Sequence, residues 1–323
     1  FVGKEALAAV GSVGPVINML IGFFNGFATG AGVVISRHYG ARQRENVRTA
    51  VQTTIAMTIL MSIVLSVLGV VLTPALLRMM QTPEEVLAHA SEYLQIYFAG
   101  LSGLLLYNMG AGILRAMGDS KRPMLFLMVT CILNVVLDLL FVAVLHMGVA
   151  GAALATVLSQ MISAVLPIVV LLRQKEDRLE LRKLRIERSL LGRILRIGIP
   201  AGLQFVTFDF SNILIQSGIN SFGDITMAAW TAHGKTDALT WMVTGAFGVS
   251  ITTFVGQNFG AQKYSRIRKG TWTCLAMGVV MVAALDALLL AFRTPILGIY
   301  TDNPEVIAVG SMVMLSIMPY EFL

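Results

Sequence analysis

The chain has 323 residues, of which 56% are hydrophobic and only 13% are charged. Soluble domains carry about 25% charged residues, so this composition argues against a large soluble core and for an all-α polytopic membrane protein. The net charge of +6 does not indicate nucleic-acid binding, because the charges lie in short clusters between long apolar runs.

The apolar runs predict about nine helices. In chain order these helices cover residues 5–36, 49–77, 84–115, 123–145, 149–172, 199–221, 225–256, 270–292 and 304–323. Turn residues separate several of them, notably at Thr82-Pro83, Met117-Gly118 and His146-Met147-Gly148. The two cysteines, Cys131 and Cys274, lie inside apolar runs, so neither a disulfide framework nor a metal site is indicated.

Basic residues predict the orientation of these helices. Twenty of the 24 lysines and arginines lie in the segments 37–48, 115–122, 173–196 and 257–269, which fall between alternate pairs of helices. The positive-inside rule makes these segments cytoplasmic. The longest of them continues into residues 189–198, where apolar and basic residues alternate at helical spacing, as expected for a helix in the membrane interface. We expect two lobes, residues 1–185 with the start of the cytoplasmic linker and residues 186–323.

An internal repeat relates the two lobes. Gly40-Ala41 matches Gly260-Ala261 at an offset of 220, and Thr73-Pro74 matches Thr294-Pro295 at an offset of 221. Both Gly-Ala turns are basic, so the repeats share one orientation and form parallel, pseudo-symmetric six-helix lobes. On this interpretation the sequence is a fragment that lacks the first helix and about the last two. A genuine nine-helix protein is the alternative.

Two motifs follow long apolar runs, Leu114-Arg115-Ala116-Met117-Gly118-Asp119-Ser120 and Val255-Gly256-Gln257-Asn258-Phe259-Gly260-Ala261. With these motifs the sequence resembles the multidrug and toxic compound extrusion (MATE) family, and the resemblance covers the whole chain. It implies a bacterial inner-membrane antiporter that exports cationic or amphipathic drugs in exchange for Na⁺ or H⁺. It also implies that the lobes alternate access to a cleft between them, and that no cofactor is needed. We expect a monomer in the lipid bilayer.

Asp138 is the strongest candidate for the coupling site, because a carboxylate inside a membrane helix is costly and functional by default. Asn134 lies one turn before it on the same face. Thr156 lies on the next helix at a similar depth. The spacing of these three residues resembles the amino-lobe cation site of the DinF-like branch of the family, in which a further Asp comes from the first helix. Hydrogen bonding between helices is the plain structural alternative for Asn134 and Thr156.

The second lobe offers further candidates in Asp209, Lys235, Asp237 and Glu321, which match the carboxylates of the NorM-like branch only approximately. Lys235 and Asp237 are two residues apart and do not share a helix face. An ion pair between Lys235 and Asp209 is the structural alternative. We expect Asp286 to lie near the outer surface in a structural role.

Two other functions compete with drug export. A lipid-linked precursor flippase of the same superfamily would line its cavity with several cations, of which only Lys235 is visible. A membrane enzyme is disfavoured, because the histidines His38, His89, His146 and His233 are dispersed and no catalytic motif is present. Methionines and aromatic residues suit promiscuous cationic ligands, but lipid-facing or core packing is the commoner explanation, so no drug pocket is assigned from them.

Overall fold

The computed structural model describes residues 3–79, 84–174 and 178–321, and every regular element in these ranges is a helix. The predicted turn at Thr82-Pro83 and the basic residue Lys175 lie outside the described residues. Contacts divide the chain into two units at Val206/Thr207, within one helix. The predicted lobe boundary at 185/186 stays a prediction.

The first unit holds seven helices and two short helical turns. They are α1 (Gly3–Gly40), α2 (Arg44–Met79), α3 (Glu84–Ala99), α4 (Leu101–Ala116), α5 (Lys121–Asp138), the π-helical turn η1 (Leu139–Val144), α6 (Gly148–Arg173), the 3₁₀ turn η2 (Leu181–Lys183) and the first part of α7 (Arg188–Asn220). Helix α4 contacts α1, α2 and α6, which explains its many buried side chains.

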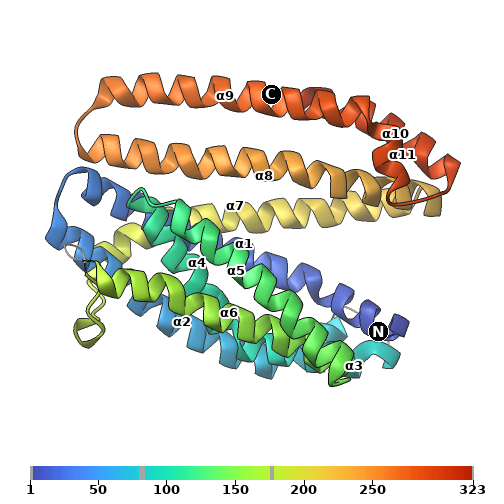
Figure 1. Cartoon of the computed structure of the whole chain (residues 1–323), viewed down its shortest axis with the longest axis horizontal. Coiled ribbons are helices and arrows are strands. Elements are labelled where there is room, and N and C mark those ends of the chain that lie inside the picture. Colours follow the sequence, from blue (N-terminus) through green and yellow to red (C-terminus); the bar gives the residue numbers. More distant parts are fainter. Residues whose placement is uncertain (1–2, 80–83, 175–177, 322–323) are drawn as a thin grey trace. The chain divides into compact units, whose positions relative to one another are not determined.

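The second unit is built on a hairpin of two long helices, α8 (Asp224–Gly260) and α9 (Tyr264–Ala291), which lie side by side (Figure 1). The short helix α10 (Arg293–Gly298) follows them. Helix α11 (Pro304–Ile317) and the 3₁₀ turn η3 (Met318–Tyr320) complete the unit, and α11 packs on α8. The end of α7 also belongs to this unit.

The predicted helices match the observed ones closely, although the short helix α10 was not predicted. Six helices in the described ranges are long and apolar enough to cross a membrane, and a seventh is obtained if α3 and α4 count as one span. The segment predicted at 84–115 is bent by 48° at Gly100. The expected interfacial helix at 189–198 is continuous with the next span, because α7 runs through Pro200 without a break.

Glycines let α1 and α7 approach closely within the first unit. A methyl group at Gly26 would lie 2.2 Å from the backbone nitrogen of Gly202, and one at Gly30 would lie 2.4 Å from the carbonyl oxygen of Ile194. No real side chain fits at such distances, so these positions require glycine. The contact holds the first half of α7 in the first unit.

The two Gly-Ala turns have the same backbone conformation. Arg42 has φ of 56° and Gln262, its equivalent 220 residues later, has φ of 57°. The hydrogen bonds around them also match in pairs: Ala41 N–H to Arg37 O (3.0 Å) and Ala261 N–H to Gln257 O (3.0 Å), then Gln43 N–H to His38 O (3.0 Å) and Lys263 N–H to Asn258 O (2.9 Å). The sequence repeat is therefore also a repeat of local structure.

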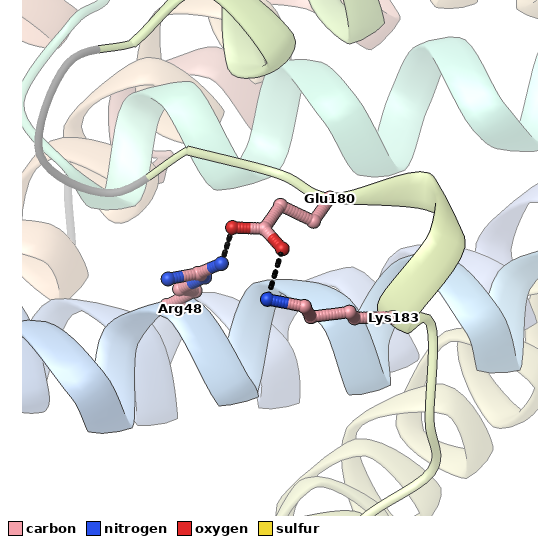
Figure 2. A network of polar contacts seen from close by, with 3 residues as sticks. All are labelled: Arg48, Glu180 and Lys183. Atoms are coloured by element: carbon pink, nitrogen blue, oxygen red, sulfur yellow. Dashed lines mark ion pairs between the residues drawn. The ribbon is translucent and has the colours of Figure 1, made fainter.

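The charged connection between α6 and α7 is fastened to α2 within the first unit. Glu180 pairs with Arg48 of α2 and with Lys183, whose Nζ lies 2.8 Å from its carboxylate (Figure 2). Thr53 of α2 donates to the carbonyl of Arg185 at 3.4 Å and accepts the N–H of Glu187 at 3.1 Å. The described part of this connection is thus an ordered strap along α2.

Candidate functional site

The first candidate site lies between α5 and α6, and a hydrogen bond sets the register of these helices. The hydroxyl groups of Thr130 on α5 and Ser163 on α6 are hydrogen bonded to each other. The two helices run antiparallel, so residues after Thr130 on α5 lie beside residues before Ser163 on α6. One turn from this pair, Asn134 is level with Ser159, and two turns from it, Asp138 is level with Thr156. The predicted similar depth of Asp138 and Thr156 agrees with this register.

Asp138 is the last residue of α5 and lies directly before the π-helical turn η1. Such turns are frequent at functional sites, because the wider turn changes the direction of nearby side chains and carbonyls. The Asp138 side chain is half-buried and forms no ion pair among the described residues. An unpaired carboxylate inside a membrane span is costly, so packing alone does not explain a carboxylate at position 138.

Two amides near Asp138 are unsatisfied. The Nδ2 atom of Asn134 and the Oε1 atom of Gln160 are buried without a hydrogen-bond partner. Gln160 lies one turn beyond Thr156 on the same face of α6, and it was not predicted as a site residue. A buried polar atom without a partner costs about 1–3 kcal/mol, so a ligand or water at this point would stabilise the protein.

Tyr93 of α3 is a second residue of this site that was not predicted from the sequence. Its phenol group lies next to the Thr156 hydroxyl and within electrostatic range of Asp138. Thr156 donates its hydroxyl proton to the carbonyl of Ala152 at 3.1 Å. The structure therefore brings Asp138 and Thr156 together around a tyrosine. The four oxygen-bearing side chains offer the hard ligands that Na⁺ prefers, or a carboxyl able to carry a proton.

The second-unit candidates separate into two groups. Lys235 is exposed, and its ammonium lies 5.5 Å from the ring centre of Tyr300. Among the described residues it forms no ion pair with Asp209, which is half-buried on α7. These two residues do not form one site.

Asp237 and Glu321, by contrast, are close to each other. A carboxylate oxygen of Asp237 lies within 4.8 Å of one of Glu321. The indole N–H of Trp241 donates to Asp237 at 3.0 Å. Asp286 acts on Glu321 electrostatically and is only 3% exposed, so it belongs to this cluster, a grouping that the sequence did not predict.

A cavity of about 680 Å³ within the second unit is adjacent to this cluster. Aromatic side chains of Phe208, Trp230 and Trp241 line it together with Asp237 and Glu321. The rings of Phe208 and Trp241 are 5.1 Å apart. Its size is that of sites for drug-like molecules, and its lining combines aromatic faces with negative charge.

Comparisons with known proteins agree with this architecture. The family model MatE matches residues 1–140 and 200–323. The probable multidrug resistance protein YoeA of Bacillus subtilis (strain 168) is 31% identical over 336 residues, which cover 99% of this chain and 71% of the relative. The probable multidrug resistance protein YpnP of the same organism is 29% identical over 309 residues, which cover 95% of this chain and 69% of the relative.

The fold is also that of a solved transporter. A structure described as the outward-facing conformation of a multidrug resistance MATE family transporter of the MOP superfamily has a TM-score of 0.92, with 24% identity. The similarity covers 99% of this chain and 72% of that chain. The family model and the relative at 31% identity show that this chain belongs to the MATE family of membrane transporters, and hence that it is not an enzyme.

Proposed function

We propose that this protein is a secondary antiporter that exports cationic or amphipathic drugs in exchange for Na⁺ or H⁺. The carrying observation is the group of Asp138, Asn134, Thr156 and Tyr93, in which an intramembrane carboxylate meets unsatisfied amides and hydroxyl groups. The family supports export, since its relatives YoeA and YpnP are named probable multidrug resistance proteins.

The coupling cycle follows from the charge on Asp138. With the carboxylate ionised, the group attracts a cation; once Na⁺ or a proton neutralises it, the cost of keeping it in the membrane falls. Binding therefore changes which conformation of the transporter is favoured, since a ligand shifts an equilibrium by its difference in affinity for the two states. Asp209, Asp237 and Glu321 are proposed as second-lobe groups that meet the substrate.

The lining of the second-unit cavity favours cationic substrates over lipid-linked phosphates. Its charged side chains, Asp237 and Glu321, are acidic, and its aromatic residues offer faces that attract cations. A flippase would need basic residues there to hold a phosphate. We further propose that the protein acts as a monomer in the bacterial inner membrane, with the basic turns after α1 and α8 on the cytoplasmic side.

The test compares ethidium transport by the parent protein and by the Asp138→Asn variant in everted membrane vesicles. We expect efflux to fall by about tenfold or more, because the amide cannot take part in the charge change that drives the cycle. Asp302→Asn is the matched control, since Asp302 is an exposed carboxylate in a loop. Unchanged efflux by the Asp138 variant at equal expression contradicts the coupling role.

A second arm separates the two ions. Vesicles are assayed at fixed pH with Na⁺ replaced by choline. Loss of efflux in choline identifies Na⁺ as the coupling ion, whereas full efflux that collapses with a protonophore identifies H⁺.

A further inference from the structure

Three potential ligand atoms for a metal converge inside the second unit. A ring nitrogen of His233, a carboxylate oxygen of Asp237 and one of Glu321 all lie within 4.8 Å of one another. His233 and Asp237 are four residues apart on α8 and share a face. Glu321 follows η3, so the cluster joins two segments that are far apart in sequence.

The polar atoms of this cluster lack partners. His233 is only 4% exposed, and its Nδ1 atom is buried without a hydrogen bond. One oxygen each of Asp237, Asp286 and Glu321 is also buried and unpartnered. Native proteins satisfy nearly all such atoms, so several at one point indicate a ligand that is bound there.

The remaining oxygens are held in place by neighbours. Trp241 donates its N–H to Oδ2 of Asp237 at 3.0 Å, and Thr240 donates its hydroxyl to Oδ1 of Asp286 at 2.9 Å. These bonds leave the other oxygen of each carboxylate available. Metal ligands are usually oriented in this manner by a second set of side chains.

The local charge is uncompensated by protein cations. Three carboxylates lie together, and among the described residues none of them forms an ion pair with a lysine or arginine. Lys235, the nearest basic residue along α8, is directed to Tyr300. Like charges so close in a membrane repel, so a bound divalent cation would stabilise the group more than a single proton can.

The histidine decides which cation fits. Na⁺, Mg²⁺ and Ca²⁺ prefer oxygen ligands, whereas imidazole suits first-row transition metals. One histidine with two carboxylates is a set that zinc accepts, with a fourth position left for water or for Asp286. The three potential ligand atoms lie within 4.8 Å of one another, so small side-chain movements would bring them to a shared zinc ion.

The fold itself does not require these residues. At the equivalent positions of the first repeat stand Val13 and Ile17, and Glu321 corresponds to Gly100 at an offset of 221. The first repeat builds the same helix–turn–helix with apolar or small residues at these points. The polar cluster is therefore an addition to the repeat rather than part of its scaffold.

We propose that His233, Asp237 and Glu321 bind a divalent transition-metal ion of the zinc type, with Trp241 and Thr240 as positioning residues. The proposed metal site shares Asp237 and Glu321 with the proposed substrate-facing groups of the second lobe, but metal binding can be measured without a gradient or a drug.

The test is titration of the purified full-length protein with ZnCl₂ in metal-free detergent buffer, followed by calorimetry and by elemental analysis after gel filtration. We expect one zinc per chain. His233→Gln, Asp237→Asn and Glu321→Gln should each weaken binding by about tenfold or more, and Trp241→Phe by about tenfold. His89→Gln is the control, because His89 is exposed on α3 and should leave binding unchanged.

A variant that gains a spectroscopic signal distinguishes loss of a metal ligand from loss of folding. His233→Cys should retain binding of CoCl₂ and add a thiolate-to-cobalt charge-transfer band, which only direct coordination produces. Stoichiometric zinc with this band supports the site. No stoichiometric zinc, or zinc that survives all three ligand variants, overturns it. A proton shared between Asp237 and Glu321 is then the explanation of their approach.

Discussion

The two repeats of this protein have the same turns but different interiors. The turns at Arg42 and Gln262 agree in φ within one degree and in their hydrogen bonds. In the first unit, glycines bring α1 and α7 into close contact, and the connection between α6 and α7 is hydrogen bonded to α2. The second unit instead carries a buried polar cluster beside a cavity. Repetition of the backbone therefore leaves the interior free to acquire different chemistry.

The largest effect is expected where the first unit is packed most tightly. Gly26→Leu should prevent correct packing of α1 on α7, at a cost of about 3 kcal/mol or more, since its Cβ would lie 2.2 Å from Gly202. Gly218→Leu in the second-unit part of α7 should be tolerated, because a Cβ there meets nothing within 4 Å. Detergent-solubilised yield and thermal unfolding measure both. Equal damage from the two variants would break the contrast in packing.

The same substitution should destabilise the two Gly-Ala turns by similar amounts. Arg42→Val and Gln262→Val place a β-branched residue at positive φ, which costs about 1–2 kcal/mol. Thermal unfolding midpoints of the two variants should fall by similar amounts. Arg42→Gly and Gln262→Gly are the controls, because glycine adopts this conformation without strain. A large effect at one turn and none at the other contradicts their equivalence.

The smallest effect is expected at the strap. Thr53→Val removes one acceptor and one donor for the connection, at a cost of about 1 kcal/mol. The connection contains many arginines, so trypsin should cut the variant faster there than the parent protein. Thr231→Val is the matched control, because Thr231 is exposed on α8 and its hydroxyl donates to the carbonyl of Met227 in the same helix. An unchanged cleavage rate for Thr53→Val shows that the strap is held by other contacts, including Glu180.

Much of the candidate site was predictable, and the reason is local. Asp138 is a lone carboxylate in an apolar run, and Asn134 follows from helical spacing. Tyr93 and Gln160 were missed, since a tyrosine or glutamine in an apolar helix has no signal of its own. The grouping of His233 and Asp286 with Asp237 and Glu321 was not predicted either. Their partners lie on other helices, and spacing along one helix does not reveal them.

Four properties can be predicted from the amino-acid sequence: the membrane class, the repeat, the positions of nearly all helices and the alternation of basic loops. These properties depend on the length of apolar runs and on charges that are neighbours in the chain. Three others required the folded structure: the break between α3 and α4 at Gly100, the proximity of Tyr93 to Thr156, and the approach of His233 and Asp237 to Glu321. The rotation of each helix about its axis selects those contacts, and it is set by packing against other helices rather than by local pattern.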